Sequence, residues 1–308
     1  MKRYGKRAAA FCLLILFFCP PVFCGCEKTG FSYEKTGDGG IRITGCEQTE
    51  GDVVIPDEIG GLPVSEIGPR AFDSCRKMTS VSIPGSVKNI GTYAFRFCVR
   101  LESVALPDGL SDLEDGVFSN CYGLKEVVFP DGLTSIGKDV FSATALENVV
   151  IPEGVRSTGE YAFYSCGTLK TVSLPSSLEK LGDYAFCACA SLSVVSLPDG
   201  LKEIGEYVFS QCDSLSSVSL PSSLVSLGGF AFAGSGIASL TLPAGTKKIG
   251  DSCFCDCPAL KDLYIPDSVT GFGLDVLEGT RGVTVHASPD SPAEIWADEN
   301  GFRFSPVS

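Results

Sequence analysis

The chain has 308 residues, with 24 Lys and Arg against 37 Asp and Glu, so its formal net charge is −13. The charges are scattered without a basic stripe, and we therefore expect no nucleic-acid partner, because phosphate binding requires clustered Lys and Arg. The chain has a single histidine, His286, and this scarcity of the commonest general base and metal ligand weighs against hydrolytic chemistry.

The first residues are typical of an export signal. Basic residues precede an apolar run from Ala8 to Phe18, which is too short to span a bilayer. Two interpretations of the next residues are open. Either Cys26, after the small Gly25, is lipidated and becomes the mature N-terminus, as in bacterial lipoproteins, or the chain is simply cleaved near Cys24. Both predict a signal peptide over residues 1–25 and an exported protein.

An internal repeat then governs the chain. Prolines that end short apolar runs recur every 22 or 23 residues, at Pro84, Pro107, Pro130, Pro152, Pro175, Pro198, Pro221, Pro243 and Pro266. A second series keeps the same step, at Phe72, Phe95, Phe118, Phe141, Phe163, Phe186, Phe209, Phe232, Phe254 and Leu277. Units this short must bury their apolar side against their neighbours, as solenoids do. We predict about ten units over residues 53–282, an N-terminal cap over 26–52 and a C-terminal cap over 283–308.

Each unit has two halves with different periodicities. In the unit that begins at Leu169, Val172 and Leu174 alternate with hydroxyl residues, which indicates a half-buried strand that ends at Pro175. The return half spaces its apolar residues as a turn or helical coil, with Gly182 at a turn that a side chain would obstruct. The predicted fold class is an α/β-type repeat solenoid, with short parallel strands on one face and turn or helical-coil returns on the other.

The two series predict columns of equivalent core side chains. Val172 is expected to lie between Val149 and Val195, and Phe186 between Phe163 and Phe209, in one continuous hydrophobic core.

At this point the sequence resembles a known family. Residues 101–107 read Leu-x-x-Val-x-Leu-Pro and residues 90–98 read Ile-Gly-x-x-Ala-Phe-x-x-Cys, which resembles the BspA-type, or treponemal-type, leucine-rich repeats of bacterial surface proteins. The resemblance covers about residues 31–304, including an opening unit at 53–56 and a closing segment at 291–302 that is similar to the family's terminal cap. It implies an exported, often adhesive, non-enzymatic leucine-rich-repeat stack whose ligand is not specified.

Seven of the 15 cysteines stand at one position of the repeat. The residues three places after the Phe series are small donors, namely Cys75, Cys98, Cys121, Thr144, Cys166, Cys189, Cys212, Ser235, Cys257 and Thr280. We predict a buried ladder in which each thiol or hydroxyl donates to a backbone carbonyl, in place of a disulfide framework. A metal site at Cys187 and Cys189, or at Cys253, Cys255 and Cys257, is not favoured, because the Cys-x-x-Cys pairs of structural zinc are absent.

Function is expected on the outward positions of the strands. The candidate ligand-binding residues are Ser80, Ser82, Ser103, Glu126, Asn148, Thr171, Ser173, Val194, Ser196, Ser217, Ser219, Ser239, Thr241, Asp262 and Tyr264. This face is rich in hydroxyl groups and almost uncharged, which suits a broad contact with an extended partner. The alternative is that small residues stand there only because neighbouring strands crowd the surface.

Two further features have competing interpretations. Tyr93, Tyr161, Tyr184, Tyr207 and Phe230 each stand two residues before a column residue. Such a file can stack on sugars or anchor a protein, but aromatic residues in this position more often shield the ends of a core. His286 follows the last predicted strand and is expected to be an ordinary surface residue.

No nucleophile elbow, phosphate loop or zinc-protease motif is present, so the sequence predicts no enzyme, cofactor or metal. The leading hypothesis is an exported cell-surface protein that binds a protein or glycan through its strand face, with membrane contact only through an N-terminal lipid. The alternative is a structural envelope protein, or a self-associating spacer, without a specific ligand.

Overall fold

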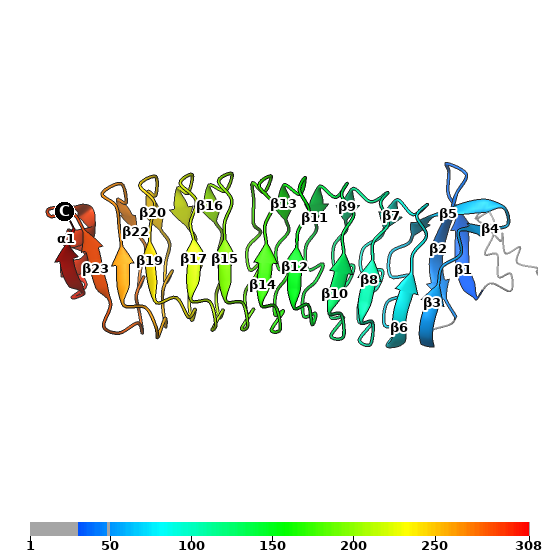
Figure 1. Cartoon of the computed structure of the whole chain (residues 1–308), viewed down its shortest axis with the longest axis horizontal. Helices are drawn as coiled ribbons and strands as arrows, with labels where there is room; N and C mark the ends of the chain where they lie inside the picture. The colour runs from blue at the N-terminus through cyan, green and yellow to red at the C-terminus, as the bar shows by residue number, and fades with distance from the viewer. Residues whose placement is uncertain (1–29, 48–49, 308) are drawn as a thin grey trace, which may run out of the picture.

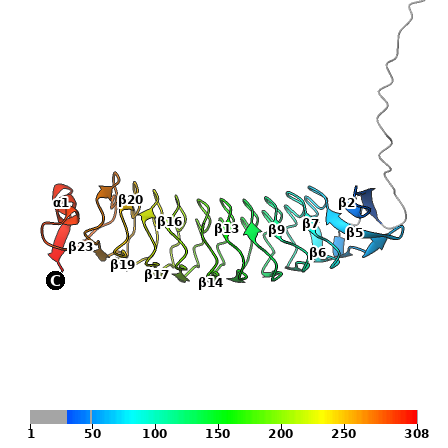
Figure 2. The same ribbon diagram turned by 90° about the horizontal axis from the view of Figure 1, so that it is seen from above.

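The computed structural model describes residues 30–47 and 50–307. Its coils follow one another along a rod with slight curvature (Figures 1 and 2). The predicted signal peptide and Cys26 lie outside the described residues. The predicted cap and repeat boundaries remain predictions.

The strands form two lengthwise ladders. The outer ladder, here the strand face, consists of β3 (Glu50–Val54), β6 (Lys77–Ser82), β8 (Ser103–Ala105), β10 (Glu126–Val128), β12 (Asn148–Val150), β14 (Thr171–Ser173), β15 (Val194–Ser196), β17 (Ser217–Ser219), β19 (Ser239–Thr241), β21 (Asp262–Tyr264), β23 (Thr284–Ala287) and β24 (Arg303–Pro306). The second ladder consists of β2 (Ile41–Cys46), β5 (Leu62–Ile67), β7 (Asn89–Ile90), β9 (Asp112–Leu113), β11 (Ser135–Ile136), β13 (Ser157–Thr158), β16 (Glu203–Ile204), β18 (Ser226–Leu227), β20 (Lys248–Ile249) and β22 (Gly271–Phe272). Coil-to-coil pairing within each ladder is parallel. The repeat predicted strands on one face only, so the second ladder was not predicted.

The returns, which were predicted as turns or helical coil, are turns, and the helical-coil form is not confirmed. Within residues 30–47 and 50–307 the sole α-helix is α1 (Pro292–Glu299), near the C-terminus. Each return has left-handed residues two places before and two places after its column residue, for example Tyr93 at φ 59° and Phe97 at φ 58° around Phe95. An α-helix requires consecutive right-handed residues, so these positions turn the chain repeatedly instead.

Hydrogen bonds show how the return is held together. The N–H of Phe95 donates to the Val117 carbonyl of the next coil at 2.9 Å, whereas the adjacent Arg96 N–H donates to Tyr93, three residues back, at 3.1 Å. The same alternation recurs along the stack, as at Phe186 and Cys187. Half of the donors therefore close local turns, and the other half join successive coils.

The predicted phenylalanine column is confirmed. Neighbouring rings from Phe72 to Phe254 lie 4.9–5.8 Å apart between centroids and within 19° of parallel. Every ring is buried, and Leu277 continues the column at 2% exposure. One continuous core therefore runs through the stack, as offset aromatic stacking and apolar burial both favour.

The predicted thiol ladder is confirmed in most coils. Cys98, Cys121, Cys166, Cys189, Cys212 and Cys257 each donate from Sγ to the carbonyl of the column Phe in the preceding coil, at 3.1–3.2 Å. Thr280 makes the same bond to Phe254 at 2.7 Å. Thr144 donates instead to Phe141 of its own coil at 2.9 Å. For Ser235 the prediction is wrong, since its hydroxyl contacts the Cys257 sulfur at 3.7 Å.

Close packing of the coils explains the glycine at the start of every return except that of Phe118, which has Glu114 there. A Cβ on Gly182 would lie 2.3 Å from the backbone carbon of Gly159, and one on Gly159 would lie 2.5 Å from the Lys138 nitrogen. The predicted obstruction at Gly182 is thus confirmed, and its cause is the preceding coil.

Secondary structure also covers both ends of the core. At one end β1 (Phe31–Lys35) pairs antiparallel with β2, and β4 (Glu58–Ile59) pairs antiparallel with β5. At the other end Ser291 caps α1 by accepting a hydrogen bond from the Glu294 N–H. Trp296 of that helix stacks on Phe272 with ring centroids 4.7 Å apart, and covers the last coil.

Two coils are one residue short, and the strand face breaks there. One residue separates Thr144 from Leu146 and Ser235 from Ile237, where Cys121 and Leu124 are separated by two. The strands that follow these short turns, β12 and β19, are not paired with β10 and β17, so the strand face is divided into three sheets. The two shortened coils are those of Thr144 and Ser235, whose hydroxyls do not make the ladder bond to the preceding coil. The same coils interrupt the strand face.

Candidate functional site: the strand face

All fifteen candidate residues lie on the strand face, as predicted from strand alternation. They are exposed, except that Ser80 and Asp262 are partly buried. Parallel register sets equivalent positions side by side, as in Asn148 beside Thr171 and Ser196 beside Ser219. The alternating inward residues, such as Val149 and Val195, are buried. This placement establishes a shared surface, while ligand binding on it remains a proposal.

Side chains of neighbouring strands bond across the face. The Thr171 hydroxyl donates to the Asn148 amide oxygen at 2.7 Å, and the Ser80 hydroxyl donates to Asp52 at 2.7 Å. The Ser80 hydroxyl, followed by that of Thr79, lowers the pKa of the Asp52 carboxyl. At the far end His286 Nε2 lies 2.8 Å from Asp262 Oδ1.

Sequence reasoning missed residues at both ends of this face. Asp52 and the exposed Val54 belong to β3, which ends before Pro56 as the other strands end before their prolines. That proline was the signal that could have extended the list. His286 is part of β23, and its ring stacks on Tyr264 with centroids 4.3 Å apart. Its side chain is only 16% exposed, so it is a packed residue of the strand face and not an ordinary surface residue.

Parts of the strand face are hollowed. A hollow of 580 Å³ lies over β10 and β12 and includes Val128, Val150 and Glu153. A second, of 870 Å³, lies over β14, β15 and β17, and includes Val194, Ser196 and Ser219. The strand face is therefore not uniformly smooth, in contrast to the sequence-based expectation.

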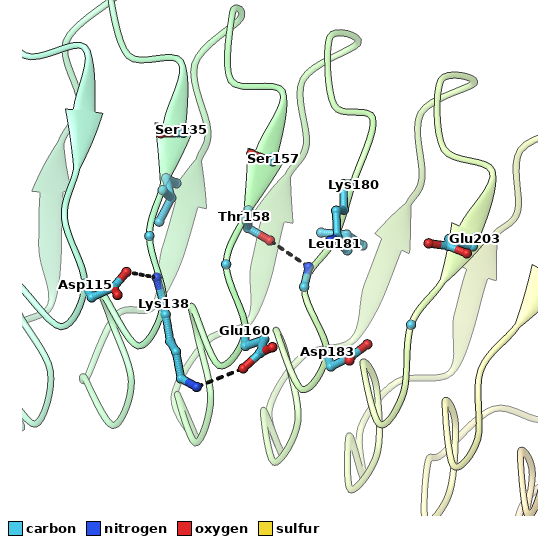
Figure 3. A pocket seen from close by; sticks show the side chains of 15 residues that line it. Asp115, Ser135, Lys138, Ser157, Thr158, Glu160, Lys180, Leu181, Asp183 and Glu203 are labelled. Atoms are coloured by element: carbon cyan, nitrogen blue, oxygen red, sulfur yellow. Dashed lines mark hydrogen bonds and ion pairs between the residues drawn. The ribbon is translucent and has the colours of Figure 1, made fainter.

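A third hollow, of 720 Å³, lies over the second ladder (Figure 3). Four of the six charged side chains that line it, those of Asp115, Lys138, Glu160 and Asp183, have partners. The Lys138 ammonium lies 2.8 Å from Glu160, and Asp115 accepts from the Lys138 N–H at 2.8 Å. Thr158 replaces the apolar residue of its column, and its hydroxyl accepts from the Gly182 N–H at 3.4 Å. These contacts stabilise the coils and leave little chemistry for a ligand.

The structure favours a structural role for the aromatic file. Tyr161, Tyr184, Tyr207 and Phe230 are half-buried and stack on one another 4.5–4.6 Å apart between centroids. Their faces are thus already covered, whereas stacking on a sugar needs a free face. Tyr93 stands apart from the file, with the Arg96 guanidinium 4.9 Å from its ring centroid.

Two ladder thiols, and the buried Cys253 thiol outside the ladder, are poor nucleophiles. Burial raises the pKa of Cys189, Cys212 and Cys253, which keeps these thiols protonated near neutral pH. A reactive cysteine requires an accessible thiolate. Within the part of the chain that the structure describes, no group of three or more His, Cys, Asp or Glu side chains is arranged to hold a metal ion.

Over the same described residues, no helix has the length and apolar character needed to cross a membrane.

Comparison with known proteins agrees with the repeat. A family model described as the BspA type leucine rich repeat region matches residues 65–193 and 180–298. A leucine-rich repeat protein of known structure from Bacteroides ovatus is 32% identical over 84% of this chain and 70% of that one, with a TM-score of 0.79. No curated protein sequence matches.

Two other solved structures share less with this chain. One from Eubacterium ventriosum, also a leucine-rich repeat protein, is 19% identical over 85% of this chain and 71% of that one, with a TM-score of 0.51. The leucine-rich repeat protein of Treponema pallidum is 27% identical over 91% of this chain and 97% of that one, with a TM-score of 0.47. With the family model matched over most of its length, the chain belongs to the BspA-type leucine-rich repeat family.

Proposed function

We propose that the protein is an exported, non-enzymatic scaffold that binds a protein or glycan partner at the bacterial cell surface through its strand face. The observation that carries the proposal is the contrast between its two sides. The inward side is nearly the same in every coil, whereas the outward strand positions are exposed and differ along the stack.

Several properties of the face suit an extended partner. Hydroxyl residues such as Ser173, Ser196 and Ser219 are exposed and offer hydrogen bonds. The 870 Å³ hollow over β14, β15 and β17 forms a shallow depression beside these residues, in which a partner could bind. Repeat solenoids commonly bind partners along such a ladder. A purely structural spacer is the alternative, in which this face would make no specific contact.

The proposal of export rests on the basic and apolar N-terminal segment, with lipidation at Cys26 or simple cleavage as its two forms. The mass of the mature N-terminus distinguishes them, because a lipid anchor adds acyl chains to Cys26. Removal of the protein from intact cells by added protease would support surface display. Persistence of the protein until the cells are lysed would contradict it.

Binding through the strand face is tested by a double substitution. Ser196→Arg with Ser219→Arg places two large cations beside the 870 Å³ hollow and should abolish capture of partners from a panel of purified host matrix proteins and immobilised glycans. The matched control, Ser214→Arg with Val225→Arg, adds the same charge at exposed residues off this face. Equal binding by both variants and the unaltered protein would remove the strand face as the binding surface.

A further inference from the structure

The two breaks in the strand face differ in chemistry, although both follow a shortened coil. At the break between β10 and β12, the first outward residues of the two strands are Glu126 and Asn148, and the last are Val128 and Val150, which are 54% and 70% exposed. At the break between β17 and β19, the equivalent residues are Ser219 and Thr241. The first break is hollowed by 580 Å³ and is apolar, while the second is hydroxylic.

Backbone donors are left unused at the first break. In six coils the residue after the strand donates to the next coil, as Leu106 N–H does to Val128 at 3.0 Å and Ile151 N–H does to Ser173 at 3.0 Å, whereas the backbone bonds of the described residues include none of this kind from Ile83 or Leu174. Over residues 30–47 and 50–307, the backbone bonds include none from Phe129 N–H to β12 and none from Glu147 N–H to the coil of β10. Unpaired strand groups of this kind are templates for an added extended segment.

Phe129 forms the floor of this hollow. It is partly buried, and its ring packs edge-on against the column residue Phe141 with centroids 5.6 Å apart. The hollow therefore offers apolar contact both on its floor and at the two valines. An exposed apolar site on a largely hydroxylic face marks an interaction site.

The charges around the hollow have one sign. Glu126, Asp131 and Glu153 line it, and no Lys or Arg does. None of the three carboxylates is in an ion pair within the described residues. The backbone and hydroxyl of Ser176 donate to Glu153 and lower the pKa of its carboxyl, so it stays ionised. Lys170 and Lys125 act on Glu147, which lies outside the lining.

We propose that the break between β10 and β12 is a docking site for an extended cationic segment of a partner protein, one that alternates apolar residues with Lys or Arg. The apolar residues contact Val128, Val150 and Phe129, the cations pair with the three carboxylates, and backbone carbonyls accept from the unused donors. The inference rests on the proposed binding role of the strand face and specifies the chemistry of the partner.

The test uses the full mature chain and a fluorescein-labelled nonapeptide that alternates lysine with valine, followed by fluorescence anisotropy. The triple variant Glu126→Gln, Asp131→Asn, Glu153→Gln should weaken binding about tenfold, from the loss of three exposed charge pairs. Val128→Ser with Val150→Ser should weaken it by a similar factor. Affinity of the unaltered protein should fall as salt is raised, because exposed pairs are screened over about 8 Å at 0.15 M salt.

The matched control is Glu203→Gln, Glu206→Gln, Asp213→Asn, which removes the same charge at exposed residues elsewhere. It should bind the peptide as the unaltered protein does, and circular dichroism should show all variants folded. Equal losses in the two triple variants would indicate nonspecific attraction and overturn the proposal. So would equal binding of a serine-valine peptide, or no peptide binding at millimolar concentration.

These outcomes are separable from failure of the proposed function. If Ser196→Arg with Ser219→Arg abolishes capture of a glycan or protein while the cationic peptide does not bind, the strand face still functions and only this docking site is rejected. Concentration-dependent dimerisation that is lost in Val128→Ser with Val150→Ser would assign the site to a second copy of the chain and reject a cationic partner.

Discussion

The buried returns and the strand face of this solenoid differ in how strictly they repeat. The returns keep a parallel phenylalanine column through every coil from Phe72 to Phe254, while the strand face divides into three sheets and changes its side chains from coil to coil. A side chain inside the stack contacts the coils before and after it, so a change there disturbs three coils. An outward side chain is held mainly from one side. The repeat is therefore constrained inside and free to vary outside, where a partner can be recognised.

The phenylalanine column is the feature that repeats most strictly along the stack. Phe186→Ala should lower the free energy of unfolding by about 3–5 kcal/mol, because it leaves a cavity between two stacked rings in a rigid stack. Urea unfolding followed by circular dichroism measures the change. Phe186→Leu, which preserves most of the volume, is the control and should cost less. A loss below about 1 kcal/mol for the alanine variant would contradict a continuous column.

The thiol ladder should be sensitive to loss of its donor. Cys212→Ala removes the bond that the thiol donates to the Phe186 carbonyl at 3.2 Å, although this carbonyl still accepts from the Cys189 N–H at 3.2 Å. The lost bond and the small cavity together should cost about 1–2 kcal/mol. Cys212→Ser retains a donor and should cost less, because the hydroxyl of Thr280 makes the equivalent hydrogen bond in its coil. Thermal or urea unfolding of the two variants under reducing conditions decides the matter. If both cost the same, the thiol contributes only volume.

Alkaline pH should lower the free energy of unfolding through the buried thiols of the returns. Burial raises the pKa of Cys189, Cys212 and Cys253 in the folded chain, whereas an unfolded thiol titrates near about 8.5. Their contribution is complete below that pH and is lost as pH rises above it, by about 1.4 kcal/mol per thiol and pH unit, because the unfolded chain then binds fewer protons.

Urea unfolding at pH 7, 8.5 and 9.5 with a reductant measures this effect. Cys189→Ser with Cys212→Ser removes two of the titrating groups and should flatten the decline between pH 8.5 and 9.5. An unchanged pH dependence in that variant would assign the decline to lysine and tyrosine residues instead.

Substitutions on the strand face should have the smallest effect on stability. Ser196→Arg with Ser219→Arg should change the free energy of unfolding by no more than about 0.5 kcal/mol, because exposed positions away from special features tolerate change. The same urea experiment measures it. A loss of several kcal/mol would show that crowding between strands, and not a ligand, explains the small residues there.

Some features of the molecule could be read directly from its sequence. The phenylalanine column and most of the thiol ladder follow from residues at a fixed step, because equivalent residues of a solenoid must stack. The sequence did not allow a helical conformation of the return to be rejected. Residues such as Tyr93 and Phe97 have no preference for φ near +60°, and their left-handed conformation comes from hydrogen bonds to the next coil. The two 22-residue steps in the sequence mark the positions of the breaks in the strand face. They do not predict that the strands on either side are unpaired.

The sequence by itself determined the period, the buried columns and which residues point outward, since these depend only on spacing and side-chain polarity. Tertiary structure alone decided that the return is a series of turns, that His286 packs on Tyr264 and that the strands separate beside Val128 and Val150. These features depend on how two coils meet, and the register between neighbouring coils is set by backbone contacts that no single repeat contains.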